Sequence, residues 1–364
     1  MKKLLFYISA LNIGGAETLI FNIVNKIDTS EFEMGFVLQS RINTNERLLE
    51  LCEQKSCKFF YIVPFYKNYI KSIKQLYDII KKEGYSLIHI HANALINITP
   101  IIAARLANID IALHSHNTRN NMGGNLGKII HYFHRSVISN INMIRLACGE
   151  DAGRWMFGRN RFEIINNAID IERYKFCKDE SLKLRKEIGI RDSFVVGHIS
   201  RFVVAKNHDY LVEIFVELLK LKPDAVLLLV GDGELRSKIE NKVSELNIKD
   251  RVVFLGMVTN PERYYSVFDC MVFPSIFEGL PFTLVEAQAS GLKVFASTNV
   301  TEEVNVTGLV DYISLEKEPL YWARYIVENY QKVDREMYFE KMQGTVYDVN
   351  NEIKRIEKAY NSVR

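Results

Sequence analysis

The chain has 364 residues, of which 48% are hydrophobic and 25% charged, so it is long enough for two folded domains and is not typical of a disordered protein. It contains no run of 18 apolar residues, so no transmembrane helix is expected. Its five cysteines form no CxxC pair, so neither a disulfide framework nor a zinc site is expected, and a reducing cytoplasm is the expected location.

The net charge of +3 is unevenly distributed. Residues 1–170 contain 20 Lys and Arg against 14 Asp and Glu, whereas residues 171–364 contain 27 against 30. The window 54–145 has 12 against 3, and it holds seven Phe and Tyr between positions 59 and 77. Basic and aromatic side chains together suit an anionic membrane surface, so we expect peripheral contact with the inner face of the cytoplasmic membrane. An ordinary solvated face is the alternative, and nucleic acid is not expected because no nucleic-acid motif accompanies the charge.

Apolar runs typical of strands alternate with helical patterns along the whole chain. In the first half, the expected strands lie near 3–9, 34–39, 58–63, 86–91, 110–115, 143–148 and 162–166, with helices such as 17–27 and 69–82. After Asp170, the expected strands lie at 194–199, 225–230, 252–255, 270–273 and 292–296, with helices at 208–221, 234–246 and 282–290. Two such series predict two doubly wound α/β domains, in which ligands bind beyond the carboxyl ends of the strands.

The most informative segment carries Glu278 and Glu286, separated by seven residues, where a strand is followed by a turn and a helix. The N-terminus of a helix presents free backbone N–H groups and the positive end of a dipole, which favour a phosphate. Carboxylates repel phosphate, so the two glutamates are expected to accept hydrogen bonds from sugar hydroxyls. A diphosphate between two polyols describes a nucleotide-sugar. The N–H groups expected to hold the phosphate belong to Gly279, Leu280, Phe282 and Thr283.

Three other loops follow expected strands. Arg201 and Lys206 offer a guanidinium fork and a point charge that can hold a diphosphate, although two surface cations are the alternative. In the turn at 230–233, Asp232 would repel phosphate, so this turn is expected to be structural or to lie near the base. The pair Gly14-Gly15 allows close approach of a ligand or forms a plain turn. It lacks the GxGxxG spacing of a dinucleotide site, which argues against an NAD enzyme.

Histidines mark two of the expected strands. We expect His114 and His116 to point in opposite directions, so that at most one of them faces a ligand. A polar, glycine-rich loop at 120–125 follows, which is typical of a lid and favours a role for His116. His89 and His91 are expected to be structural. No cluster of His, Asp or Glu shows metal-ligand spacing and no DxD motif occurs, so no metal or other cofactor is expected.

Together these motifs resemble a known family. The stretch from Val195 to about Leu315 resembles the carboxyl-terminal domain of retaining GT-B glycosyltransferases of family 4, the glycosyl transferases group 1, and the rest of the chain resembles them more weakly. The resemblance implies Rossmann-like domains at 1–170 and 171–345 that face each other across a cleft, and a last helix within 346–364 that crosses back. The motifs that carry it are Glu278-x7-Glu286, Ser200-Arg201 with Lys206, Val230-Gly-Asp-Gly233, Phe254-Leu-Gly256 and Gly14-Gly-Ala-Glu17.

The resemblance also implies roles for single residues. Arg201 and Lys206 would bind the diphosphate and stabilise its charge as it leaves. Glu286 would accept the ribose hydroxyls, and Glu278 would hold hydroxyls of the transferred sugar. With His116, which matches the family's cleft histidine, these residues except Glu286 are the candidate catalytic groups. The other candidates are Gly15, Gly279, Leu280, Phe282 and Thr283 toward the donor, and Asn117 and Asn167 toward the acceptor or the domain junction.

Two positions depart from the family's pattern. Ala168, between Asn167 and Asp170 at the expected junction, replaces a glycine, so its turn must avoid the left-handed conformation. Pro281 replaces an amide donor at the expected phosphate site.

The expected activity is that of a retaining hexosyltransferase for exopolysaccharide, capsule or lipopolysaccharide. It would move a sugar from a nucleotide-diphosphate sugar, with uridine as the preferred base, to a saccharide or lipid-linked saccharide. Because no metal motif occurs, Arg201, Lys206 and the helix amides must neutralise the departing charge. We hypothesise a same-face reaction assisted by the leaving phosphate. The alternatives are a GT-B-fold nucleotide-sugar epimerase, a phosphorylase-like enzyme with pyridoxal phosphate, and a non-catalytic nucleotide-sugar binder.

Overall fold

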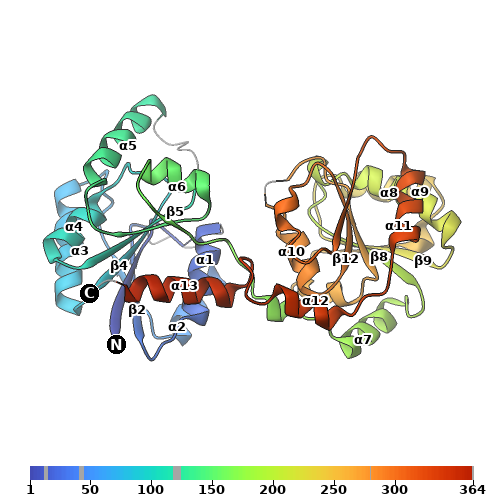
Figure 1. The fold of residues 1–364 in the computed structure, drawn as a ribbon, viewed down its shortest axis with the longest axis horizontal. Coiled ribbons are helices and arrows are strands. Elements are labelled where there is room, and N and C mark those ends of the chain that lie inside the picture. The colour runs from blue at the N-terminus through green and yellow to red at the C-terminus, as the bar shows by residue number, and fades with distance from the viewer. Residues whose placement is uncertain (12–14, 41–44, 118–123, 279, 363–364) are drawn as a thin grey trace. The chain divides into compact units, whose positions relative to one another are not determined.

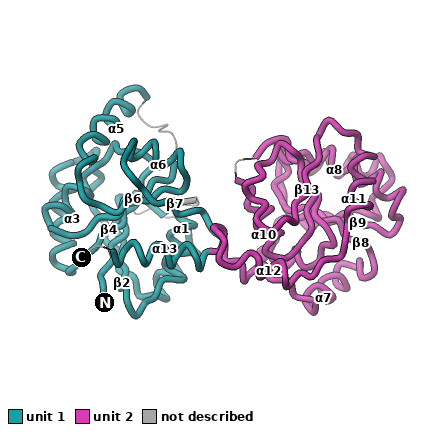
Figure 2. The backbone as a smooth tube through the Cα atoms, in the orientation of Figure 1, with its two compact units in different colours: residues 1–168, 349–364 teal, residues 169–348 magenta. Residues whose placement is uncertain are grey.

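The computed structural model describes residues 1–11, 15–40, 45–117, 124–278 and 280–362. The chain divides into two compact units (Figure 2). Unit 1 comprises residues 1–168 and 349–364, and unit 2 comprises residues 169–348. The last helix therefore belongs to unit 1, although all of unit 2 precedes it in the chain. The limits expected from the sequence are residues 170 and 345.

Unit 1 is built on a seven-stranded parallel sheet in the order β3-β2-β1-β4-β5-β6-β7. The central strands are apolar on both sides, as a sheet covered on both faces requires, and Leu4, Leu5 and Phe6 of β1 are all fully buried. The strands are β1 (Lys2–Tyr7), β2 (Phe32–Leu38), β3 (Lys58–Tyr61), β4 (Leu87–Ala92), β5 (Asp110–Ser115), β6 (Ile144–Ala147) and β7 (Glu163–Ile164).

Helices cover both faces of this sheet (Figure 1). The helices α1, α2 and α13 share one buried core with Phe6, whereas α3 and α4 share the other with Leu5. In α13, the buried Ile353, Ile356 and Tyr360 recur every three to four residues, so one stripe of the helix faces the core. The helices of unit 1 are α1 (Gly15–Lys26), α2 (Glu46–Gln54), α3 (Tyr69–Glu83), α4 (Thr99–Ala107), α5 (Gly124–Ile138), α6 (Glu150–Phe157) and α13 (Val349–Asn361).

Unit 2 is built on a six-stranded parallel sheet in the order β10-β9-β8-β11-β12-β13. Its strands are β8 (Phe194–Ile199), β9 (Ala225–Val230), β10 (Val252–Gly256), β11 (Cys270–Phe273), β12 (Lys293–Ser297) and β13 (Val310–Ile313). Its α-helices are α7 (Lys178–Ile188), α8 (His208–Leu221), α9 (Arg236–Glu245), α10 (Phe282–Ala289), α11 (Pro319–Asn329) and α12 (Arg335–Met342). Its short 3-10 helices are η1 (Ile171–Tyr174), η2 (Val204–Lys206), η3 (Lys249–Arg251), η4 (Pro261–Ser266) and η5 (Glu302–Val304).

The two sheets share one topology. Counted from the first strand of each unit, the first six strands of both sheets lie in the order 3-2-1-4-5-6, which is the Rossmann order. The prediction of two doubly wound α/β domains is therefore confirmed. In this topology ligands bind where the order reverses, beside β1 and β4 in unit 1 and beside β8 and β11 in unit 2. No helix in the described ranges is both long and apolar enough to span a bilayer.

Candidate active site

The reversal point of unit 2 brings two candidate residues together. Arg201 and Lys206 follow β8, Glu278 follows β11, and these two strands are neighbours in the sheet. Lys206 Nζ lies 2.6 Å from Glu278 Oε1, and the two side chains are only 19% and 11% exposed. A lysine and a glutamate 72 positions apart in the chain thus form one partly buried ion pair at the edge where a ligand is expected.

The Lys206 ammonium group has a defined position. Its Nζ lies 5.1 Å from the centroid of the Phe273 ring, within the range of a cation–π interaction. The next residue, Asn207, donates from Nδ2 to the carbonyl of Pro274 at 3.1 Å, which ties the loop after β8 to the segment after β11. An ammonium group has three N–H donors, and the ion pair uses one of them. The other donors are therefore available to phosphate oxygens.

The loop of Arg201 rests on the glycine-rich turn after β9. The N–H of Phe202 donates to the carbonyl of Asp232 at 3.0 Å. Gly231 has a φ of +127°, and a Cβ there would lie 2.0 Å from the carbonyl oxygen of Ser200, so only glycine fits. The turn thus supports the neighbouring loop. Arg201 itself is exposed, and its guanidinium makes no ion pair within the described ranges.

The N-terminus of α10 provides fewer free amides than expected. The N–H of Phe282 donates to the carbonyl of Leu280 at 3.0 Å, so the prediction that it is free for a phosphate is wrong. The cause is the tight turn at Pro281, which also leaves α10 without a side-chain cap. The N–H groups of Leu280 and Thr283 have no partner in the part of the chain that the structure describes. Gly279 lies outside the described residues.

Two tyrosines hold Glu286, about one turn inside α10. Tyr174 donates to its Oε1 at 3.1 Å, and Tyr265 donates to its Oε2 at 2.5 Å. Burial raises the pKa of Glu286 above its usual value, and the two hydrogen bonds oppose that rise. Each carboxylate oxygen keeps a second lone pair that can accept a ribose hydroxyl. Sequence reasoning missed both tyrosines because they lie outside any motif, on η1 and η4.

Unit 1 has a cavity of about 350 Å³ at its own reversal point, beyond β1 and β4. Its lining is mostly uncharged. The hydroxyl of Tyr7 accepts hydrogen bonds from Asn97 Nδ2 at 2.9 Å and from Gln39 Nε2 at 2.8 Å. Burial raises the pKa of Tyr7 to about 12, so its hydroxyl is neutral at pH 7. Gly15 begins α1, and Ala16, the next residue, borders the cavity.

His116 also borders this cavity, but its relation to His114 differs from the prediction. The two rings stack with centroids 4.4 Å apart, so the expectation that they point in opposite directions is wrong. Residues two apart along a strand lie on the same face of the sheet. His116 follows directly after β5 and still lies on the same face as His114. Burial lowers the pKa of His116 to about 4, so it is neutral at pH 7. Its Nε2 lies 2.8 Å from Nδ1 of His91.

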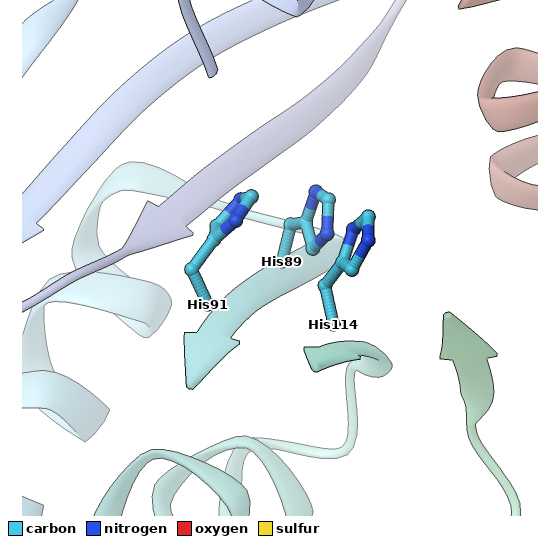
Figure 3. A group of neighbouring side chains, drawn as sticks. All are labelled: His89, His91 and His114. Atoms are coloured by element: carbon cyan, nitrogen blue, oxygen red, sulfur yellow. The ribbon is translucent and has the colours of Figure 1, made fainter. Parts of the chain in front are cut away.

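A cluster of three histidines lies beside His116 (Figure 3). His89, His91 and His114 each offer one ring nitrogen within 4.8 Å of the other two. The expectation from sequence spacing does not include this group. The residues come from neighbouring strands, β4 and β5, and His91 pairs in register with His114, a relation that sequence spacing does not reveal.

The junction residues complete the predicted set. Asn117 is exposed, whereas the side-chain oxygen of Asn167 is buried and has no partner among the described residues. Ala168 is not among the described residues with positive φ, which confirms that its turn avoids the left-handed conformation. Asp170 stands at the start of η1. Asn117 and Asn167 belong to unit 1, as do His116 and Gly15, and the other site candidates belong to unit 2.

Comparison with known proteins assigns the family. Residues 180–313 match the family model described as glycosyl transferases group 1. The chain is 32% identical to the putative glycosyltransferase EpsF of Bacillus subtilis (strain 168), over 99% of this chain and 96% of that protein. The chain therefore belongs to the glycosyltransferases with a group 1 domain.

Two further similarities agree with this family. The UDP-Gal:alpha-D-GlcNAc-diphosphoundecaprenol alpha-1,3-galactosyltransferase of Escherichia coli is 28% identical, over 63% of this chain and 62% of that protein. The crystal structure of Anabaena HepE in complex with UDP superimposes with a TM-score of 0.73, over 100% of both chains at 20% identity. At that identity the likeness concerns the fold, which is of the GT-B type.

Proposed function

We propose that this glycosyltransferase is a retaining enzyme of family 4 that transfers a hexose from a UDP-sugar to a lipid-linked saccharide in cell-surface polysaccharide synthesis. The observation that carries the proposal is the grouping of Arg201, Lys206, Glu278 and the free Thr283 amide around one reversal point. The HepE structure, solved with UDP, supports the choice of uridine. The name of the Escherichia coli relative, with its UDP-Gal donor and its undecaprenol diphosphate acceptor, supports both the donor and the lipid carrier.

On the donor side, the charges match the parts of a nucleotide-sugar. Arg201 and the two unused donors of Lys206 bind the diphosphate oxygens, and the Thr283 N–H adds a hydrogen bond at the positive end of α10. Glu278 keeps Lys206 in place with one oxygen and accepts a hydroxyl of the transferred sugar with the other. Glu286, held by its two tyrosines, accepts the ribose hydroxyls.

The reaction follows from these positions. The bond between the anomeric carbon and the diphosphate oxygen breaks, and the nucleoside diphosphate leaves with the electron pair. Arg201 and Lys206 stabilise the negative charge that develops on it. The acceptor hydroxyl attacks from the same face, forms the new C–O bond and gives its proton to the leaving phosphate oxygen. Attack on that face retains the anomeric configuration without a covalent glycosyl-enzyme.

On the acceptor side, α5 presents an apolar face to solvent. The exposed side chains Leu126, Ile129, Phe133 and Val137 recur every three to four residues and form one stripe. The buried residues of the helix, among them Gly127 and His131, lie on the other side. Lys128 and Arg135 add positive charge to the same helix. An exposed apolar stripe on a helix that also carries cations suits the surface of an anionic bilayer.

This helix is joined to the cavity of unit 1. Nδ1 of His131 accepts a hydrogen bond from the N–H of Leu95 at 3.0 Å, and Nδ1 of His134 donates to the carbonyl of Leu95 at 2.6 Å. Ala94 and Ile96, on either side of Leu95, line the cavity. A lipid carrier held at α5 would therefore bring its saccharide beside the cavity.

The test measures nucleotide release from UDP-, GDP- and ADP-sugars, with and without membrane lipid extract. We expect release of UDP that lipid stimulates and that both Lys206→Ala and Glu286→Ala abolish. Lys220→Ala is the control, because Lys220 is an exposed lysine that pairs with Glu217 at 2.6 Å on the surface of α8. Nuclear magnetic resonance of the product reports the anomeric configuration.

Other outcomes reject parts of the proposal. Conversion of the donor to an isomer without nucleotide release identifies an epimerase. Binding of the donor without turnover under every acceptor condition identifies a non-catalytic binder. Release of GDP or ADP alone overturns the choice of uridine, and a trapped, kinetically competent glycosyl-enzyme overturns the same-face mechanism.

A further inference from the structure

His89, His91 and His114 lie in the core of unit 1, where they are 0%, 8% and 0% exposed (Figure 3). They face the core that α1 and α13 cover, since the His89 ring lies 5.7 Å from Phe6 and its Nδ1 lies 2.6 Å from the hydroxyl of Tyr360. Three imidazoles therefore occupy positions at which this fold otherwise places apolar side chains.

Several nitrogens of the cluster have no partner. Nε2 of His89, Nε2 of His91 and both ring nitrogens of His114 are buried and accept or donate no hydrogen bond within the described part of the chain. A buried polar atom without a partner costs about 1–3 kcal/mol, and most such atoms in proteins are satisfied. Four such atoms at one place indicate that these ring nitrogens bind a ligand.

The opposite nitrogens of two rings are already held, as in metal sites. His89 uses Nδ1 toward the Tyr360 hydroxyl, and His91 uses Nδ1 toward His116 Nε2 at 2.8 Å. When Nδ1 is the donor in each of these contacts, Nε2 keeps a free lone pair for a metal ion.

We propose that His89, His91 and His114 bind a divalent transition-metal ion, with zinc as the first candidate. Donor sets made of imidazole favour zinc, copper, nickel or iron over magnesium and calcium, which prefer oxygen. Three histidines are a sufficient ligand set for zinc and leave a fourth position open. This site is separate from the residues of unit 2 proposed to bind the diphosphate, and two of its three ligands, His89 and His91, are residues for which the sequence predicts a structural role.

Metal binding requires a local rearrangement of the three rings. Zinc–nitrogen bonds of about 2.0–2.1 Å need the three nitrogens to converge by on the order of 1 Å from their separations of up to 4.8 Å. The rings of His89 and His114 lie within 15° of parallel, so the His114 ring must also turn about χ2. That torsion is broad for histidine and no hydrogen bond holds the His114 nitrogens within the described part of the chain, but the buried ring stacks on His91 and His116, so these rings must shift with it.

The cavity of unit 1 gives the ion a way in, and the ion affects the cavity. His91 and His116 both line it. An ion on Nε2 of His91 requires the hydrogen to be on Nδ1, which then donates to Nε2 of His116. His116 must then carry its own hydrogen on Nδ1. The metal therefore determines which ring nitrogen of His116 carries the hydrogen. Because His116 borders the cavity beside which the acceptor saccharide is proposed to lie, the metal acts as a positioning element.

The test uses the full chain without a polyhistidine tag. The metal content of the purified protein is measured by mass spectrometry. The protein is then treated with chelator and titrated with cobalt(II), read by its visible absorption, and with zinc(II) in competition. We expect one ion per chain. We expect His114→Phe and His89→Phe to weaken binding by roughly 100-fold or more, and Tyr360→Phe, which removes only the outer hydrogen bond, to weaken it by roughly 10-fold.

His131→Phe is the matched control, because His131 is also fully buried in unit 1 but lies outside the cluster, stacked on Trp155. It should keep the ion. Circular dichroism establishes which variants fold, and Tyr360→Phe is the mildest change if a histidine variant does not. The proposal is overturned if the folded parent binds neither cobalt(II) nor zinc(II) at micromolar concentration. It is equally overturned if Tyr360→Phe and the folded histidine variants bind as tightly as the parent, since the ion then sits elsewhere.

Discussion

Units 1 and 2 have the same strand order around their reversal points and place opposite chemistries there. The edge beside β8 and β11 carries charges, namely Arg201, the Lys206–Glu278 pair and Glu286. The edge beside β1 and β4 carries mostly uncharged groups, namely a tyrosine hydroxyl, amides and imidazoles whose pKa values are low, together with the side chain of Glu17. The comparison teaches that this fold determines where a ligand binds and leaves its chemical nature to loop residues.

The difference also suits the two substrates of a glycosyltransferase. A donor diphosphate needs cations and helix amides, whereas an acceptor hydroxyl needs only uncharged hydrogen-bonding groups. Four predictions test whether charged and uncharged groups are divided between the two units in this way.

The largest effect is expected at the ion pair of unit 2. Lys206→Met removes a donor aimed at developing charge, so kcat should fall by roughly 100- to 1000-fold. Steady-state kinetics with the donor that the nucleotide-release assay selects measure it. The surface variant Lys220→Met should leave kcat unchanged. Equal losses in both variants would show that the effect is one of general charge and not of position.

Acid should destabilise unit 1 more than unit 2. Five histidines of unit 1 and two of unit 2 have pKa values below the usual 6.5 in the folded state. Between pH 6.5 and the folded pKa, the unfolded chain binds more protons, so each such histidine lowers the free energy of unfolding by up to about 1.4 kcal/mol per pH unit as the pH falls. Above pH 6.5 the effect is absent.

Hydrogen exchange of the chelator-treated protein at pH 7 and pH 5.5 measures the two units separately. The raised carboxyl pKa values of Glu352 in unit 1 and Glu286 in unit 2 act in the opposite direction, one in each unit, and so change the comparison little. A steeper loss of hydrogen-exchange protection in unit 2 than in unit 1 would contradict the assignment of the mostly uncharged edge, with its low-pKa histidines, to unit 1.

A smaller effect is expected at Glu286. Glu286→Gln removes the charge that we propose accepts the ribose hydroxyls, and hydrogen bonds to charged groups contribute about 1.5–3 kcal/mol, so the Kd for UDP should rise roughly 10- to 100-fold. Calorimetric titration measures this. Tyr7→Phe, at the neutral edge of unit 1, should leave the Kd for UDP unchanged. A matching loss in Tyr7→Phe would mean that the donor depends on both edges.

The smallest effect is expected on α5. Phe133→Ser and Ile129→Ser remove exposed apolar side chains, each of which contributes about 1.5–3 kcal/mol when fully buried, so binding to anionic vesicles should weaken by at most roughly 10- to 100-fold for each. Vesicle sedimentation measures it. Leu182→Ser, at an exposed leucine of α7 in unit 2, is the control. If all three variants bind vesicles equally, the stripe on α5 is not the membrane surface.

The sequence predicts the framework well because continuous apolar runs specify buried parallel strands. Strand β13 is absent from the prediction, because its four residues include the charged Asp311 and form no such run. The positions of Lys206 and Glu278 follow from strand order. Individual side-chain contacts between distant segments cannot be predicted from the sequence. The tyrosine partners of Glu286 and the register of β4 with β5 are two examples. The Phe282 amide was misjudged because the turn at Pro281 uses it locally.

The return of α13 to unit 1 has a consequence for the order of assembly during synthesis. Val349, Ile353, Ile356 and Tyr360 complete a core whose other buried members lie within residues 4–168, and they are translated only after all of unit 2. Unit 2 is continuous in sequence and can fold while the chain is still growing. The amino-terminal half of this protein is therefore the last to become fully folded. Its apolar faces stay incompletely covered while the ribosome adds the 180 intervening residues of unit 2.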